Sequence, residues 1–438
     1  MTVSAAYPRV LLVSSAKIKA DDPAYLLVRT EFGDWPKERL AQIFASDDLA
    51  GQGEFCGRTY QLGAGDRLFG RLFRRLRGQV SGMVAVDALQ GSVQPPAATG
   101  LRRWVKAAKK RLGDWLISSG VWEVLFHVRV SPSMAQFVET FHPDLIYCQG
   151  YSLGFSSLPL MLSRRFDCPI CFQTTDDWPA YTYRASPVGW LLRRRARQLV
   201  LTSKVRMAFG EKMRQIFEAR YQVPFLVTYH SDQAERFRCP AVNRPAGPRT
   251  ILFTGNLGLR RYEAIGDLLE VIRTSDLGDL NIEVRVYTSG LPKEVPESLR
   301  LAPEIRFLPL PSHEELPSVL AAGDVLFLPE SFSVEPKMID LSVSTKCHLY
   351  MLSGRPVLVY GPPYCGTVDY AYREGWAVVV RERSSQVLGA ALVSLLSDEA
   401  ILSKISQNAG LVAVQNHDLA MNRASFLIAL NSILKIDQ

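Results

Sequence analysis

Short runs of apolar residues recur along the chain, separated by stretches long enough to form a helix. In the first half they occupy residues 9–14, 144–148, 169–173 and 225–229; in the second half they occupy 250–254, 283–287, 325–328 and 356–360. A continuous apolar run is typical of a strand buried on both faces of a parallel sheet. The alternation predicts repeated β-α units, and therefore an α/β fold, in both halves.

Helical periodicity and capping signals accompany these strands. Ile265, Leu268, Leu269 and Ile272 follow the i, i+3, i+4, i+7 spacing of an amphipathic helix. Ser312 and Glu315 have the spacing of a capping box that opens the next helix. A last helix is predicted from about Leu419, with its apolar face carried by residues 426, 427, 430, 433 and 434.

A segment rich in proline and glycine separates the two halves. Residues 239–248 read CPAVNRPAGP, which suits neither a helix nor a central strand. We therefore expect an N-terminal domain over residues 1–240, a linker over 241–249 and a second α/β domain over 250–415. Residues 416–438 are expected to pack back toward the first domain, and two such domains would meet at a cleft.

Composition and charge add one feature to this plan. The 438 residues are 47% hydrophobic and 21% charged, which excludes a disordered or fibrous chain. The net charge is +8, and residues 67–117 alone carry +9. The remainder of the chain is therefore close to neutral, at −1.

The basic segment has an amphipathic pattern with aromatic residues, typical of helices that lie in anionic membrane interfaces. A solvated helix at the edge of a core is the alternative; nucleic acid is a third that no recognition motif supports. The side chains expected to face a membrane are Arg71, Arg74, Arg75, Arg77, Trp104, Lys109 and Lys110.

Targeting signals and cysteines indicate the compartment. The N-terminal residues show no secretory signal, and no apolar run approaches the roughly 20 residues of a membrane-spanning helix. Seven scattered cysteines suit a reducing compartment, and the CxxC of Cys168 and Cys171 is interpreted as structural. We expect a cytoplasmic protein, peripheral on the inner face of the cell membrane if the basic segment binds lipid.

Two stretches of the second half carry candidate anion-binding groups. In the sequence FTGNLGLRR, an apolar strand runs into Gly255, Asn256 and Gly258 and then into Arg260 and Arg261. Glycines let backbone N–H groups approach an anion and arginines neutralise it, so this outlines a diphosphate site. A tight turn with solvated arginines is equally compatible, and a third glycine of the dinucleotide fingerprint is missing.

The second stretch begins at Ser344 and carries Lys346 near the start of a short helix. That helix is expected to end at Gly354, because Arg355-Pro356 cannot continue it. Lys346 would favour an anion there, although an isolated lysine is more often a solvated surface residue. Its place opposite the glycine turn of the same domain favours the binding role.

The first half places two candidate site loops at the carboxyl ends of its strands. Asp176 and Asp177 follow the strand ending at Gln173 and are candidates to orient a substrate hydroxyl or take its proton. A capping role is the alternative for either aspartate. Gly150 and Tyr151 follow the strand ending at Cys148 and form a second, less specific loop.

These motifs resemble the donor domain of the retaining GT-B glycosyltransferases of group 1, or family 4. The resemblance rests on the GNLG turn, on Ser344-Thr-Lys346, on Leu349-Tyr350 and on Gly354-Arg-Pro-Val357, in that order. It covers residues 250–415 well and the first half loosely. It implies two Rossmann-like domains facing a central cleft.

By this resemblance, Arg260 or Arg261 together with Lys346 would hold the diphosphate of a nucleotide sugar. No cofactor or metal would then be required. The family's ribose-binding glutamate falls at Leu349, which cannot accept a hydrogen bond, so Glu335 and Asp340 are the nearby candidates to replace it.

The sequence thus predicts a glycosyltransferase acting on a nucleotide sugar and a saccharide or lipid-linked hydroxyl acceptor, in bacterial surface polysaccharide or glycolipid synthesis. Two alternatives stay open: an inactive GT-B-shaped scaffold protein, as Leu349 allows, and a nucleotide-sugar epimerase. Nothing in the sequence sets the oligomeric state.

Overall fold

A computed structural model describes residues 7–20, 25–46, 53–70, 111, 114–237, 248–274 and 281–434. The chain forms two compact units. The N-terminal unit comprises residues 1–208, 214–227 and 424–438, and the C-terminal unit comprises 209–213 and 228–423. All seven predicted membrane-facing residues, from Arg71 to Lys110, lie outside the described residues, as does most of the predicted linker.

The N-terminal unit is built on a parallel sheet with strand order β3-β2-β1-β4-β5-β6-β7. Its strands are β1 (Val10–Val13), β2 (Leu40–Phe44), β3 (Arg58–Gln61), β4 (Leu145–Cys148), β5 (Ile170–Thr174), β6 (Val205–Phe209) and β7 (Leu226–Thr228). Its helices are α1 (Leu26–Glu31), η2 (Lys37–Arg39), η3 (Ala64–Asp66), α4 (Val121–Leu125), α5 (Pro132–Phe141), α6 (Leu153–Phe166), α7 (Trp178–Tyr181), α8 (Pro187–Thr202) and α9 (Glu211–Tyr221).

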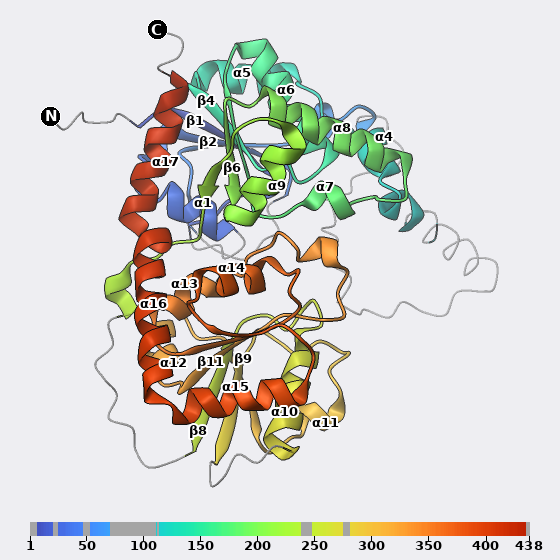
Figure 1. Cartoon of the computed structure of the whole chain (residues 1–438). Helices are drawn as coiled ribbons and strands as arrows, with labels where there is room; N and C mark the ends of the chain where they lie inside the picture. Colours follow the sequence, from blue (N-terminus) through green and yellow to red (C-terminus); the bar gives the residue numbers. More distant parts are fainter. Residues whose placement is uncertain are drawn as a thin grey trace, which may run out of the picture. The chain divides into compact units, whose positions relative to one another are not determined.

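Helices cover both faces of this sheet, which is why β1, β2, β4 and β5 are apolar and buried throughout. One face packs against α1 and α17 (Leu419–Leu434), whose residues Phe426, Leu430 and Ile433 belong to its core (Figure 1). On the other side, α6 packs against α8. The predicted final helix is therefore present, and its residues from 424 onward belong to the N-terminal unit.

The C-terminal unit has a second parallel sheet, with strand order β10-β9-β8-β11-β12-β13. Its strands are β8 (Arg249–Thr254), β9 (Ile282–Tyr287), β10 (Ile305–Leu308), β11 (Val325–Pro329), β12 (Val357–Tyr360) and β13 (Val378–Val380). Its helices are η4 (Ala234–Phe237), α10 (Arg261–Thr274), α11 (Glu297–Arg300), α12 (Leu316–Ala321), η5 (Pro336–Met338), α13 (Lys346–Leu352), α14 (Gly366–Glu374), α15 (Ser385–Ser397) and α16 (Glu399–His417).

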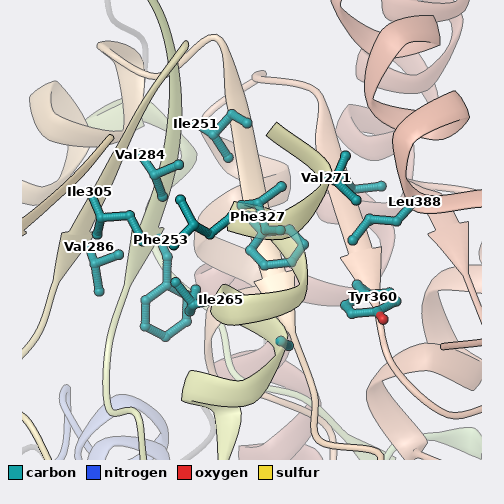
Figure 2. Close-up of a cluster of buried hydrophobic side chains, with 14 of the residues drawn as sticks. Ile251, Phe253, Ile265, Val271, Val284, Val286, Ile305, Phe327, Tyr360 and Leu388 are labelled. Carbon is teal, nitrogen blue, oxygen red and sulfur yellow. The ribbon is translucent and has the colours of Figure 1, made fainter. Parts of the chain in front are cut away.

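The core of this unit lies between the sheet and the pair α10 and α15. Ile251 and Phe253 of β8, Phe327 of β11 and Tyr360 of β12 meet Ile265 of α10 there (Figure 2). Both sheets reverse their strand order beside their first strand, and ligands of such sheets bind outside the carboxyl ends of the strands at that point. The α/β prediction is confirmed, and the carboxyl end of β8 is the place to look for a site.

The predicted terminal signals of two helices are also present. Ser312 N–H donates to Glu315 Oε2 over 2.9 Å and Glu315 N–H donates to Ser312 Oγ over 3.2 Å, a reciprocal capping box before α12. Gly354 follows α13 with a φ of 66°. Within the described residues, no single helix is long and apolar enough to cross a bilayer; the bent pair Ser385–Ser397 and Ala400–His417 passes together by length and composition alone.

Candidate functional site

The glycine turn after β8 lies at the carboxyl edge of the C-terminal sheet, where hydrogen bonds fix its backbone. Thr254 N–H donates to the Tyr350 hydroxyl over 2.9 Å, and Gly255 N–H donates to the Tyr287 carbonyl over 2.8 Å. Asn256 Oδ1 accepts from Gly258 N–H, which folds the turn back on itself. The turn is thus fixed from both sides before α10 begins at Arg261.

Lys346 lies directly against this turn. Gly255 has a φ of 133°, and a Cβ added there would overlap Cε of Lys346 and come within 2.8 Å of its Nζ. The ammonium also lies 5.5 Å from the centre of the Phe253 ring, within cation–π range. Glycine is therefore required at 255 both for its backbone conformation and for the close approach of Lys346. The structure brings together two motifs that lie about 90 residues apart.

Arg261 reaches the same place from the start of α10. Its Nε and Nη2 donate to Glu330 Oε2 over 3.1 and 3.0 Å, and the two side chains are only 15% and 3% exposed. Glu330 directly follows β11, and its Oε1 accepts from Thr367 Oγ1 over 3.1 Å. Arg261, Glu330 and Lys346 form a cluster with a net charge of +1.

The electrostatics of the cluster suit an anion. Burial and the nearby charge of Arg261 lower the pKa of Lys346 to about 8, although Glu330 opposes this shift. At pH 7 the ammonium therefore stays charged. Two cations beside a glycine turn at the carboxyl end of a parallel strand can bind phosphate groups.

Arg260 lies elsewhere, although it is adjacent to Arg261 in the sequence. Its side chain is 56% exposed and is ion-paired with Glu263. Glu263 in turn accepts from Ser333 Oγ over 2.6 Å. Arg260 and Glu263 line a cavity of about 460 Å³ beside α10, together with Asp267, Ser298 and Arg383. Of the two predicted arginines, only Arg261 is in contact with the Glu330 cluster.

The predicted ribose-binding positions surround α13. Leu349 is partly buried on that helix, one turn after Lys346. Glu335 is exposed at the start of η5, and Asp340 follows it with its N–H bonded to the Pro336 carbonyl over 2.8 Å. The two acids thus lie on the loop between β11 and α13.

In the N-terminal unit the two adjacent aspartates have different surroundings. Asp177 is 4% exposed and accepts a bidentate pair from Arg220 Nη1 and Nη2, over 2.8 and 2.7 Å. Both of its oxygens are therefore occupied by a partner of the same unit. This is the geometry of a carboxylate that ties α9 to the loop after β5.

Asp176 is less constrained. Its carboxylate accepts from the Tyr181 hydroxyl over 3.2 Å and from the backbone N–H of Trp178, and no arginine is paired with it among the described residues. Burial, more than the charge of Asp177, raises the pKa of Asp176 to about 6, close to the pH at which a general base works. The predicted acceptor-side loop lies beside it: Gly150 has a φ of 78°, and the Tyr151 hydroxyl lies 2.7 Å from Thr175 Oγ1.

The described ends of the basic segment, residues 67–117, carry exposed apolar side chains. Leu68, Phe69, Trp115 and Ile117 are each about half exposed. On α8, the 59% exposed Trp190 lies under Arg194, with the guanidinium 5.5 Å from the ring centre. Exposed apolar side chains mark an interaction surface where they form one contiguous patch, whereas single ones are common on any protein.

The cysteines of the CxxC motif lie in the interior. Cys168 and Cys171 are 3% and 0% exposed, and burial raises the pKa of both thiols. Protonated, enclosed thiols are poor nucleophiles and poor metal ligands.

Sequence analysis missed Glu330 and Thr367. Glu330 is the acid that directly follows the buried run of residues 325–329, at the same sheet edge as the glycine turn. Asp176 and Asp177 are predicted as site residues because they follow a buried strand, and Glu330 has the same position after its own strand.

Comparisons with known proteins support the fold. No protein-family model matches this chain, and no curated protein matches it. Solved structures do match over nearly its whole length. HepE from Anabaena, solved in complex with UDP and glucose, aligns with a TM-score of 0.61 and 14% identity, covering 97% of this chain and 100% of HepE.

Two further structures match to the same degree. Sucrose-phosphate synthase from Thermosynechococcus elongatus aligns with a TM-score of 0.62 and 12% identity, over 98% of this chain and 99% of the synthase. WaaG, a glycosyltransferase involved in lipopolysaccharide biosynthesis, aligns with a TM-score of 0.54 and 13% identity, over 96% and 99%. The fold is therefore that of the GT-B glycosyltransferases.

Proposed function

We propose that this protein is a glycosyltransferase that moves a sugar from a nucleotide-sugar donor to a hydroxyl acceptor. The observation that carries the proposal is the convergence of Lys346 and Arg261 on the glycine turn after β8. In a transfer reaction, negative charge develops on the leaving diphosphate, and preorganised cations stabilise it. The two side chains supply that charge, so the proposal requires no metal.

A uridine diphosphate donor is the first choice. HepE, which shares the fold, was solved with UDP and with UDP-glucose. Glu335 and Asp340 are proposed to bind the ribose hydroxyls in place of the missing glutamate at Leu349. Retention of the anomeric configuration is proposed on the resemblance to family 4.

The acceptor would use the N-terminal unit. Asp176 is proposed as the group that orients or deprotonates the acceptor hydroxyl, with Gly150 and Tyr151 in the neighbouring loop. A saccharide or lipid-linked acceptor of a bacterial surface glycan is proposed, in keeping with the involvement of WaaG in lipopolysaccharide biosynthesis. Catalysis would then take place in the cytoplasm, at the inner face of the membrane.

Nucleotide binding tests the proposal directly. Calorimetry with UDP, GDP, ADP and UDP-glucose should detect at least one ligand. Arg261→Ala and Lys346→Met should each weaken it by about 10- to 100-fold, because each removes a charge-assisted contact worth roughly 1.5–3 kcal/mol. Arg260→Ala is the matched control, since the same charge is removed one residue away, and it should change affinity less than twofold.

Three outcomes separate the alternatives. If the wild-type protein binds no nucleotide, or if Arg260→Ala weakens binding as much as Arg261→Ala does, the proposed site is wrong. Binding without turnover on crude lipid and saccharide acceptors would indicate a scaffold protein. Conversion of the donor without any acceptor would indicate an epimerase.

We further propose that the segment 67–117 binds anionic membranes. The support is its charge of +9 and the half-exposed Leu68, Phe69, Trp115 and Ile117 at its described ends. Changing Arg71, Arg74, Arg75 and Arg77 to Ser should abolish flotation with phosphatidylglycerol vesicles. A control variant with Ser at the exposed Lys293 and Lys404 should float like wild type. Unchanged flotation of the arginine variant would contradict membrane binding.

A further inference from the structure

Glu330 lies directly after the carboxyl end of the central strand β11, and this buried position is unusual for an acid. Its N–H donates to the Tyr360 carbonyl over 2.8 Å, so its backbone continues the pairing of β11 with β12. Its side chain is only 3% exposed. Neighbouring Gly361 leaves no spare room, since a Cβ added there would lie 2.8 Å from Cβ of Glu330. A buried carboxylate is costly unless charged and polar partners surround it.

One of its oxygens holds Arg261. Glu330 Oε2 accepts from both Nε and Nη2 of the guanidinium, which fixes the plane and the direction of that group. Among the described residues, Nη1 of Arg261 has no hydrogen-bond partner. One edge of the guanidinium is therefore fixed from behind while N–H donors stay available on the other.

The other oxygen is connected to the backbone of Lys346 through three hydrogen bonds. Glu330 Oε1 accepts from Thr367 Oγ1 over 3.1 Å, and the same hydroxyl accepts from Ser344 N–H over 2.9 Å. Ser344 Oγ then accepts from Lys346 N–H over 3.3 Å, at the first residue of α13. A single carboxylate thus connects α10, α14 and the segment that begins α13.

Charge adds to this connection. The negative charge of Glu330 opposes the burial and the Arg261 charge that lower the pKa of Lys346. Without the Glu330 carboxylate, a smaller fraction of the Lys346 side chain would be protonated near pH 8. The carboxylate therefore acts on both cations, on one by direct hydrogen bonds and on the other by position and charge.

We propose that Glu330 is the positioning residue of the phosphate site: it holds Arg261 and, through Thr367 and Ser344, Lys346 in one arrangement that receives a nucleoside diphosphate. The inference rests on the proposed function, because it concerns the same site. It does not require Glu330 to touch the ligand. A carboxylate facing the ligand instead would repel it, and its removal would strengthen binding.

The test is the pH dependence of UDP affinity, measured by calorimetry from pH 6.5 to 9 in the wild type and in Glu330→Gln. Wild-type affinity should fall as the pH rises above about 8, where free Lys346 loses its proton. In Glu330→Gln the affinity at pH 8 should drop on the order of tenfold, and the fall should begin at lower pH. Replacement of a residue with a purely structural role would not shift the pH at which the UDP affinity begins to fall.

The matched control is Glu263→Gln, which removes the carboxylate that binds the neighbouring Arg260 at the start of the same helix. It should leave both the affinity and its pH profile unchanged. Thr367→Val cuts the link to Ser344 without removing a charge and should weaken UDP binding, whereas Thr367→Ser, which keeps the hydroxyl, should restore it. These two variants carry the test if Glu330→Gln does not fold.

The outcomes distinguish this inference from the function on which it rests. Absence of binding of UDP, GDP, ADP and UDP-glucose in the wild type would count against the proposed function itself; if one of the others binds in place of UDP, the same pH series is run with that nucleotide. Wild-type binding together with equal or tighter binding and an unshifted pH profile in Glu330→Gln would overturn the positioning role alone. Equal affinities of Thr367→Val and Thr367→Ser would overturn the connection to Lys346.

Discussion

Adjacent residues of one type have different roles in this protein. Arg260 is exposed and paired with Glu263, whereas Arg261 is enclosed by Glu330. Asp176 and Asp177 differ in the same way, since Arg220 occupies both oxygens of Asp177 only. The side chains of consecutive residues point in different directions. The sequence therefore identifies each pair as a candidate, and the fold decides which of the two residues is available for the site.

Because only Asp177 is paired with Arg220, we expect replacement of the two aspartates to affect catalysis differently. Asp176→Asn should lower kcat for sugar transfer by two to four orders of magnitude and leave UDP affinity unchanged, because a general base is lost. Wild-type activity should also fall as the pH drops through about 6, where Asp176 takes up a proton. Transfer assays from pH 5 to 8 measure both effects.

Asp177→Asn is the comparison at the neighbouring position. It should lower the free energy of unfolding by about 2 kcal/mol, less than a fully enclosed pair, because the Arg220 side chain is 38% exposed. Its pH profile of activity should match the wild type. Loss of the bend near pH 6 in this variant, and not in Asp176→Asn, would reverse the two assignments.

At the scale of helices and strands, apolar patterning identified the four central strands of the C-terminal sheet but missed two interior strands of the N-terminal sheet, β2 and β6. The sequence predicted four strands in each half, and the described sheets contain seven and six. The missed β3, Arg58–Gln61, is polar and largely exposed, so it has no apolar run to find. Edge strands are stabilised by pairing to a neighbour, which a hydrophobic pattern does not record.

The final helix shows what its apolar face contributes. Phe426 of α17 is 3% exposed and lies edge-on to Phe32, with ring centres 5.0 Å apart. Phe426→Ala should reduce the free energy of unfolding by about 3–5 kcal/mol in urea titrations. Ile428→Ala, on the same helix but 67% exposed, should change it by less than about 0.5 kcal/mol. A loss in Phe426→Ala as small as the one expected for Ile428→Ala would show that this helix does not form part of the core.

At the scale of the whole molecule, the chain changes unit more often than the sequence suggested. The expected boundary fell at residues 240–250, whereas residues 209–213 and 228–237 belong to the C-terminal unit. Residues 424–434 belong to the N-terminal unit, toward which residues 416–438 are expected to pack. Such exchanges depend on which surface a segment packs against. A proline- and glycine-rich segment marks where the chain is irregular and not where its packing partner changes.

Three buried histidines of the C-terminal unit predict how stability depends on pH. His230, His348 and His417 have ring centres 5.7 and 5.9 Å apart, and His417 Nε2 lies 2.9 Å from the Tyr370 hydroxyl. Burial lowers their pKa values, to about 3 for His230 and about 4 for His417, and also well below the usual range for His348. All three are therefore neutral in the folded protein at pH 5.

The unfolded chain takes up protons at these histidines below about pH 6.5, while the folded protein does not. Stability is thus complete above pH 6.5 and should fall as the pH drops, by up to about 1.4 kcal/mol per pH unit for each histidine. Urea unfolding between pH 7 and 5 measures the slope. His348→Leu should flatten it, and the exposed His142→Asn should not; equal slopes in all three proteins would refute the argument.

The sequence by itself determined the α/β class, eight of the thirteen strands in the two described sheets, the glycine turn and the residue types of the phosphate site, because these depend on local pattern and on the chemistry of single side chains. Only the tertiary structure decided that Lys346 packs on Gly255, that Arg261 and not Arg260 meets Glu330, and that Asp177 is already paired. Those facts join residues up to about 90 positions apart. They depend on the direction in which each side chain leaves the backbone and on what is packed around it, which no one-dimensional pattern contains.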